Sequence, residues 1–236
     1  SLNIGMNYSV LEETIKLEGL NNGSIKYKLG LEKVLGKHST SIHTIVDQIS
    51  TGKLIKESDI DNIVKYTLNA TYMWQVNDNH KINFSNIFYH HNEEGTSPLM
   101  NTKTIIGRNN SNLNHNIVLN KSWSLNHILQ QQTYSRKYIE EWNAGSQSGT
   151  MQTDDLVEEY FLEYECILNN NNFNLGMETS LTSYNNNRID TKSPYIFSNS
   201  IFSQYNTHIL NRYNVIVGLR IDKYSDYQYV YSPRIG

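Results

Sequence analysis

Apolar and polar residues alternate along most of this chain with a period of two, over longer stretches than a soluble strand requires. The clearest stretch has a polar set that only Met73 interrupts and an apolar set of Val64, Tyr66, Leu68, Ala70, Tyr72, Trp74 and Val76. Successive side chains of a strand point to opposite faces, so one face is apolar and the other polar. About thirteen residues of this pattern exceed the usual five or six and suit a tilted bilayer crossing, which takes roughly 9 to 11.

The same alternation recurs along the chain and predicts about ten or eleven strands. The clearest segments are residues 2–10, 25–31, 64–76, 113–119, 160–168, 173–177 and 213–221. Their opposite faces carry Asn, Lys, Glu, Thr and Ser, as a wet lumen requires. A two-sheet sandwich would tolerate those residues on its outer surface, so alternation alone leaves both architectures open.

Two kinds of connection take turns along the chain. Asn-rich and Gly-rich segments that suit tight hairpins lie at residues 21–24, 77–80, 120–122 and 169–172. Longer polar stretches lie near residues 37–62, 92–111, 142–152 and 185–194. Short periplasmic turns and long extracellular loops are typical of an outer-membrane barrel, so the order favours an antiparallel transmembrane β-barrel.

Aromatic residues gather beside the short turns, where they would form a girdle at one membrane interface. The residues concerned are Trp74, Trp123, Phe173, Tyr205 and Tyr213. Tyr195 and Tyr205 are ten residues apart, which on a strand tilted near 45° spans roughly 23 Å along the membrane normal, close to the apolar band of about 25 Å.

Composition excludes several other classes of protein. The chain is only 38% hydrophobic, yet it has 17 Tyr and 3 Pro, which argues against disorder. Its 20 basic and 23 acidic residues are scattered without a basic run, so nucleic acid is not a predicted partner. The single cysteine, Cys166, excludes an internal disulfide. No apolar run of 18 residues is present for a membrane-spanning helix.

The C-terminal segments resemble the mid-barrel region of TonB-dependent outer-membrane receptors. Residues 218–222 follow the pattern Gly-Leu-Arg-x-Asp, residues 232–236 follow Ser-Pro-Arg-x-Gly, and residues 175–178 resemble a strand with leucine, glycine and glutamate. The resemblance looks closest to the catecholate-siderophore, colicin and cobalamin branch. The haem-uptake signatures, an aromatic-Arg-Ala-Pro segment and Asn-Pro-x-Leu, are not found, so haem is disfavoured.

The resemblance implies passive binding of a ferric siderophore or cobalamin, followed by energy-dependent passage across the bacterial outer membrane. The family's plug domain and TonB-contacting segment are not found in residues 1–236, and neither are its last strands. We therefore expect one partial β-barrel domain over residues 1–236, contacts with outer-membrane lipid and lipopolysaccharide, and coupling to TonB through a plug region outside this sequence.

Candidate ligand-binding residues lie in the segments predicted to be outer loops, where cationic and aromatic groups can attract and stack on an anionic chelate. They are Tyr89, His90, His91, Arg108, Tyr138, Trp142 and Arg188. His90 and His91 are adjacent, so on a strand they would point to opposite faces and could not both bind one ion. No metal site or cofactor is predicted.

No motif predicts an enzyme, since a Gly-x-Ser-x-Gly elbow, a phosphate-binding loop and a His-Glu-x-x-His helix are missing from the sequence. Two alternatives to a TonB-dependent receptor remain at this point. One is another outer-membrane barrel, such as a porin or an adhesin. The other is a secreted all-β carbohydrate-binding domain, which would pack residues 64–76 against residues 213–221.

Overall fold

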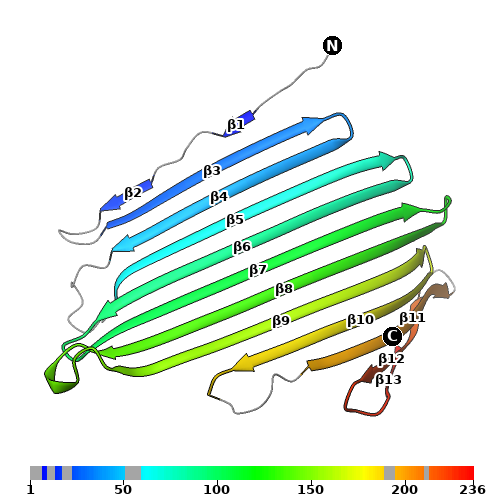
Figure 1. The fold of residues 1–236 in the computed structure, drawn as a ribbon. Helices are drawn as coiled ribbons and strands as arrows, with labels where there is room; N and C mark the ends of the chain where they lie inside the picture. Colours follow the sequence, from blue (N-terminus) through cyan, green and yellow to red (C-terminus); the bar gives the residue numbers. More distant parts are fainter. Residues whose placement is uncertain (1–6, 10–13, 18–22, 51–59, 189–194, 210–212) are drawn as a thin grey trace.

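The computed structural model describes residues 7–9, 14–17, 23–50, 60–188, 195–209 and 213–236. They form one antiparallel sheet, in which long strands lie side by side in chain order (Figure 1). The strands are β1 (Asn7–Ser9), β2 (Thr14–Leu17), β3 (Gly23–Leu35), β4 (His38–Ser50), β5 (Ile60–Asn77), β6 (His80–Thr96), β7 (Met100–Val118), β8 (Trp123–Trp142), β9 (Met151–Asn170), β10 (Phe173–Asn186), β11 (Tyr195–Ile209), β12 (Tyr213–Tyr224) and β13 (Val230–Ile235).

Eleven strands, β3 to β13, follow one another across the sheet, while the short strands β1 and β2 both pair with β3. This confirms the all-β fold and the expected ten or eleven strands. In the described part of the chain β13 pairs with β12 alone, so the sheet is open. The predicted strand at residues 2–10 falls largely outside the described residues.

The two faces of the sheet differ as the alternation predicts. On β5, Leu68 stands opposite Thr44 of β4 and Phe88 of β6, whereas its neighbour Asn69 stands opposite His43 and Ile87. We call the side of Leu68 the apolar face and the side of Asn69 the polar face. Most of the large exposed hydrophobic side chains belong to the apolar face.

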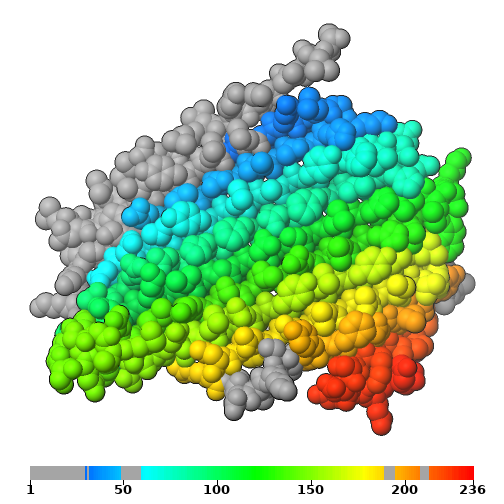
Figure 2. Space-filling model, viewed as in Figure 1, coloured from blue at the N-terminus to red at the C-terminus, as the bar shows by residue number. Residues whose placement is uncertain are grey.

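Burial is inverted relative to a soluble protein. No hydrophobic side chain among the described residues is buried, whereas His91, Ser198, Ser200 and Asp222 are buried on the polar face. In Figure 2 no described segment lies across the face in view, and all the strands belong to one sheet. The packing of residues 64–76 against residues 213–221 that the secreted alternative requires is not found among the described residues, where β5 and β12 are separated by six strands of one sheet and no hydrophobic side chain is buried.

The apolar band crosses the strands obliquely. The centre of the band on β5 is Ala70. Following the residue pairs from strand to strand, the position aligned with Ala70 is Phe197 on β11 and then Ser225, whose N–H is hydrogen-bonded to Phe197. On β12, however, the apolar residues 213–221 centre on Val217. A displacement of about eight residues over seven strand-to-strand steps corresponds to a tilt of about 40°, as in transmembrane barrels.

Asparagine side chains close three of the short turns. The carboxamide oxygens of Asn77, Asn120 and Asn170 accept hydrogen bonds from backbone N–H groups two or three residues further on, at 2.7 to 3.1 Å. These Asx turns explain why asparagine marks this end of the sheet. The predicted turn at residues 21–24 lies partly outside the described residues.

The tight turns predicted near residues 77–80, 120–122 and 169–172 are found, but the connections do not alternate strictly in length, because only residues 97–99 join β6 to β7, and two expected outer loops are largely strand. Residues 38–50 form β4 after a tight turn at Gly36, whose φ is 55°, and residues 92–111 belong mostly to β6 and β7. We call the edge with the short turns the short-turn end and the opposite edge the long-loop end. For residues 92–111, which lie toward the long-loop end, both faces of a strand can be polar outside hydrocarbon, so the alternation fades while the backbone ladder continues. β4 instead lies beside the apolar stretch of β5, but its positions on the apolar face include His38, Thr40 and Thr44, so no continuous apolar alternation marks it.

Some of the aromatic residues at the short-turn end lie next to one another. The rings of Trp123 and Phe173 meet edge to face with centroids 6.4 Å apart, and Phe173 stands opposite Tyr205. Tyr195 and Tyr205 share the apolar face of β11, as predicted. No helix in the described part of the chain has the length and apolar character that a membrane crossing needs.

Candidate functional site

An ionic network occupies the polar face of β10, β11 and β12. The Arg220 guanidinium donates to both carboxylate oxygens of Glu178, at 3.1 and 3.2 Å, and to Asp222, at 2.8 Å. Ser200 accepts from Arg220 at 2.9 Å and donates to Asp222 at 2.6 Å. Because the bidentate contact fixes the guanidinium plane, the network joins three strands rigidly.

Strand register assembles this network. Glu178 on β10 stands opposite Ser200 on β11, and Ser200 stands opposite Asp222 on β12. Arg220 lies two residues from Asp222 and reaches across to Glu178. The residues share one face because each strand places alternate side chains on the same side.

A glycine and a phenylalanine shape the floor beneath Arg220. Gly176 on β10 stands opposite Phe202 on β11, and a Cβ atom at position 176 would collide with the Phe202 ring. The Arg220 guanidinium lies over the same ring, 5.8 Å from its centroid. The missing side chain therefore lets Phe202 lie flat and support the arginine.

Two further carboxylates, Glu163 and Glu165, face the same network from β9. Glu165 stands opposite Glu178, and both glutamates interact electrostatically with Glu178 and Arg220. With Glu178 and Asp222 they outnumber the single arginine. The polar face is consequently acidic here and would attract a cationic group.

A second group lies on the polar face nearer the long-loop end. Arg108 on β7 stands opposite Tyr89 on β6 and Tyr134 on β8, and its guanidinium lies 5.1 Å from the Tyr134 ring centroid. Arg136 lies 5.9 Å from the ring centroid of Tyr138. Arginine over aromatic rings offers both charge and a flat stacking surface.

Tyr138 closes this second group. Its hydroxyl donates to Glu140 at 2.6 Å, and Thr153 donates to the same carboxylate at 2.8 Å. The hydrogen bond to Glu140 raises the pKa of Tyr138 to about 12. The same bond, with that from Thr153, lowers the pKa of Glu140, so the pair is a neutral phenol and a carboxylate at neutral pH.

A hollow opens beside these residues on the polar face, with a volume of about 670 Å³. Its lining includes Arg108, Tyr134, Glu159, Phe161 and Tyr184. The volume lies within the range of small-molecule sites. Cationic, aromatic and carboxamide groups can therefore meet a ligand of drug-like size on this wall.

Six of the seven predicted site residues lie on strands and not in outer loops, which corrects their expected position. Arg108 and Tyr138 belong to the second group, with Tyr89 beside Arg108. Trp142 ends β8 and donates to Gln152 at 2.9 Å. Arg188 follows β10 and is paired with Asp155.

His90 and His91 point to opposite faces, as adjacent strand residues must. His90 lies on the apolar face beside Tyr66, with ring centroids 6.0 Å apart. His91 is buried on the polar face, hydrogen-bonded to Tyr89 at 3.2 Å and to Glu93 at 3.3 Å. Among the described residues, no three His, Cys, Asp or Glu side chains form a group that could hold a metal ion.

Sequence reasoning missed the Arg220 network as a site. Arg220, Asp222 and Glu178 all lie within the segments that resemble receptor strands, yet Arg220 and Glu178 are 42 residues apart. The sequence does carry a signal for this network, because each of the three residues lies on the polar face of a strand with alternating apolar and polar residues. Their contact required the register of three strands.

Comparisons by sequence find no matching protein-family model and no matching curated protein. By structure, the chain matches a mutant of the ferric enterobactin receptor PfeA from Pseudomonas aeruginosa, with a TM-score of 0.67 over 100% of this chain at 13% identity. It also matches the siderophore receptor PirA from Acinetobacter baumannii, at 0.67 over 94% with 12% identity, and PiuA from the same organism, at 0.65 over 94% with 8% identity.

The chain spans 41%, 39% and 46% of the lengths of these three proteins. At such low identity the likeness establishes the fold. The chain thus has the fold of the barrel wall of outer-membrane siderophore receptors, and the predicted resemblance to TonB-dependent receptors is confirmed at the level of fold.

Proposed function

We propose that this chain is part of the wall of a TonB-dependent outer-membrane receptor that takes up a ferric chelate. The observation that carries the proposal is the inverted sheet, with an apolar face outside and an ionic, hollowed polar face inside. Lipid explains the first face and a wet lumen explains the second. The named ligands of the matched receptors support a ferric siderophore over cobalamin.

The second group on the polar face is the proposed ligand contact. Arg108 and Arg136 supply positive charge, while Tyr134 and Tyr138 supply rings for an anionic, aromatic chelate. The proposed set of ligand contacts also includes four other residues predicted from the sequence, namely Tyr89, His91, Trp142 and Arg188. His90 is assigned to the outer surface, because it shares the apolar face with Tyr66.

The acidic network around Arg220 suits a cationic partner within the lumen. We propose that residues 1–236 act as one β-barrel domain, and that TonB acts through a plug domain lodged against this wall. The surplus carboxylates Glu163 and Glu165 support that arrangement, since a positive group would offset them. No step in this function makes or breaks a covalent bond.

Binding of radioiron-labelled ferric enterobactin to outer membranes tests the ligand proposal. Arg136→Ala should weaken binding about tenfold, which corresponds to about 1.4 kcal/mol. Lys137→Ala is the matched control, because the adjacent residue belongs to the apolar face. Equal affinities of the two variants would contradict the proposal, and tighter binding of cyanocobalamin by the unaltered protein would shift the ligand to cobalamin.

A further inference from the structure

Four asparagines follow one another along the polar face of β7, between the second group and the short-turn end. They are Asn110, Asn112, Asn114 and Asn116. Arg108 of the second group lies on the same face, because side chains two residues apart on a strand share a side. The separation of Arg108 and Asn116 along the chain corresponds to roughly 27 Å of strand. The asparagines therefore lead from the proposed ligand contact toward the short-turn end.

The neighbouring strand β8 continues this carboxamide-rich surface. Three of the four residues opposite the asparagines also carry carboxamides, namely Gln132, Gln130 and Asn126. Asn116 donates a hydrogen bond to Asn126 across the two strands. Each of these carboxamide-bearing residues is exposed or half-exposed. We call the four asparagines of β7 and these three residues of β8 the carboxamide lane.

The carboxamide lane is uncharged along its length and has a cation at each end. Between the levels of Arg108 and Lys81, the described strands β6, β7 and β8 carry no charged side chain on the polar face. Lys81 stands opposite Asn116, where the lane ends. The two cations can attract an anion at either end. The carboxamides between them offer hydrogen bonds without a charge that would hold the anion.

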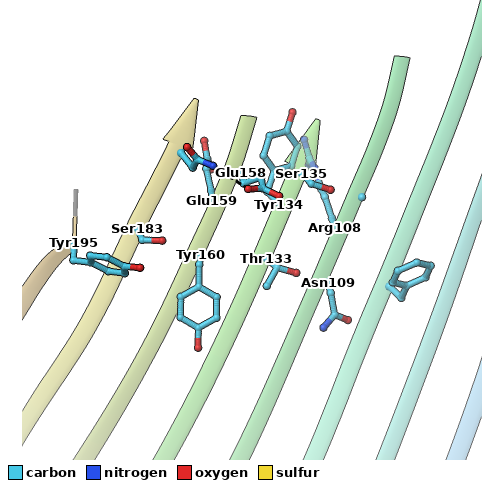
Figure 3. A pocket seen from close by; sticks show the side chains of 13 residues that line it. Arg108, Asn109, Thr133, Tyr134, Ser135, Glu158, Glu159, Tyr160, Ser183 and Tyr195 are labelled. Atoms are coloured by element: carbon cyan, nitrogen blue, oxygen red, sulfur yellow. Dashed lines mark hydrogen bonds between the residues drawn. The ribbon is translucent and has the colours of Figure 1, made fainter. Parts of the chain in front are cut away.

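The lane begins at the hollow beside the second group. Asn110 and Gln132 line this hollow together with Arg108 and Tyr134. Figure 3 shows Arg108 beside Tyr134, and the Arg108 guanidinium carbon lies 5.1 Å from the centroid of the Tyr134 ring. A chelate held by this arginine and this ring would therefore already lie against the first two carboxamides of the lane.

The polar face on the far side of β8 has the opposite character. Glu163 on β9 stands opposite Gln130, and beyond it lies the acidic network around Arg220. Carboxylates repel an anionic chelate. Between the second group and the short-turn end, the lane is thus a course along which an anion meets hydrogen-bonding groups and no carboxylate.

We propose that the carboxamide lane is the path by which an anionic chelate leaves the second group and moves toward the short-turn end. Successive asparagines are about 7 Å apart along β7. Each can donate hydrogen bonds to the oxygen atoms of a chelate, so one set of bonds is exchanged for the next without the breaking of an ion pair. The inference rests on the proposed function and adds to it the wall that the ligand follows.

Uptake and binding of radioiron-labelled ferric enterobactin separate the path from the ligand contact. Both are measured with cells that make the full-length protein. Asn114→Asp replaces a carboxamide by a carboxylate of the same size, some 20 Å along the strand from Arg108. It should slow uptake about tenfold, because a like charge about 10 Å away repels the passing anion even at an effective dielectric constant of about 20. Equilibrium binding at the second group should change less than about twofold.

Gln204→Glu is the matched control. It also turns a carboxamide into a carboxylate on the polar face, but Gln204 lies on β11, three strands away from β8. Its rate of uptake should equal that of the unaltered protein. Equal slowing in both variants would overturn the proposal, since any added charge in the lumen would then suffice. Uptake by Asn114→Asp as fast as by the unaltered protein would overturn it as well.

Binding by the unaltered protein distinguishes failure of the path from failure of the proposed function. If that protein binds no ferric enterobactin, the ligand proposal is wrong and the path with it. Normal binding with equally fast uptake in every variant would overturn the path alone.

A fluorophore attached to Asn114→Cys provides a second measurement if Asn114→Asp fails to assemble. Its emission should fall during uptake, because the ferric chelate quenches a fluorophore that it passes. The same label on Gln204→Cys should change less. Unchanged emission at position 114 during uptake would also overturn the proposal.

Discussion

At the scale of single residues, position 176 shows how a missing side chain can place a functional group. The Phe202 ring takes the space that a Cβ atom would need, and Arg220 lies over that ring while holding Glu178. The contacts by which Arg220 joins three strands therefore require a glycine at position 176. The alternation of the sequence marks position 176 as polar-facing but does not reveal this packing.

Replacing this glycine should strain the network. Gly176→Ala is expected to lower the free energy of unfolding by about 1 to 3 kcal/mol, because the added methyl group displaces the Phe202 ring. Urea unfolding in detergent micelles, followed by tryptophan fluorescence, measures the change. The double variant Gly176→Ala/Phe202→Leu should recover part of the loss, and additive losses would show that the two residues are not coupled.

Removing the arginine should leave the carboxylates unbalanced. Arg220→Ala is expected to lower the free energy of unfolding by about 1 to 3 kcal/mol, a range that allows for the partial exposure of the guanidinium. Arg220→Lys should lose less, because it keeps the charge but not the two-pronged contact with Glu178. The exposed Arg234 provides the control, since Arg234→Ala should change stability by less than about 0.5 kcal/mol. An Arg220→Ala protein as stable as that control would contradict the assigned role.

At the scale of elements, the strands are longer than a bilayer requires. β8 and β9 have 20 residues each, whereas a crossing takes roughly 9 to 11. Their halves at the long-loop end extend beyond the hydrocarbon, where both faces carry polar residues. This explains why the sequence suggested loops at residues 92–111, and why most of the predicted site residues lie on strands.

The two faces of β5 predict opposite responses to one added charge. Leu68→Arg is expected to cost about 2 to 4 kcal/mol, because Leu68 lies close to the centre of the apolar band. Asn69→Arg should be mild, since the lumen is wet on the polar face. The measurement is the free energy of folding into lipid vesicles. Similar costs at these adjacent positions would mean that lipid does not cover the apolar face.

At the scale of the whole molecule, the sheet reverses the usual arrangement of a soluble protein. Among the described residues no hydrophobic side chain is buried, whereas four polar ones are. The apolar band runs at about 40° to the direction along which paired residues align across the strands, as a barrel wall with tilted strands requires. Neither feature depends on any single residue.

This arrangement predicts where the protein partitions. It should remain in the membrane fraction after alkaline carbonate washing and should require detergent for extraction, because the apolar face needs lipid or detergent as solvent. A peripheral protein of the same membranes, released by the wash, serves as the control. Recovery of folded protein in the aqueous fraction would contradict the membrane assignment.

The sequence by itself determined the fold class, the two faces and the tight turns near residues 77–80, 120–122 and 169–172. These features are local, since side-chain alternation follows from the geometry of one strand and Asx turns from the chemistry of a few residues. It also marked Arg108 and Tyr138 as candidate ligand contacts, but it expected them in outer loops, whereas they lie on β7 and β8. Residues 38–50 escaped prediction as a strand, since no continuous apolar alternation marks them.

Only the tertiary structure decided which residues meet. The contacts of Arg220 with Glu178 and of Arg108 with Tyr134 each join different strands. A shift of one residue in register would move each partner to the opposite face. Pairing between strands is set by the summed hydrogen bonds and contacts of the whole ladder, which no single stretch of sequence contains.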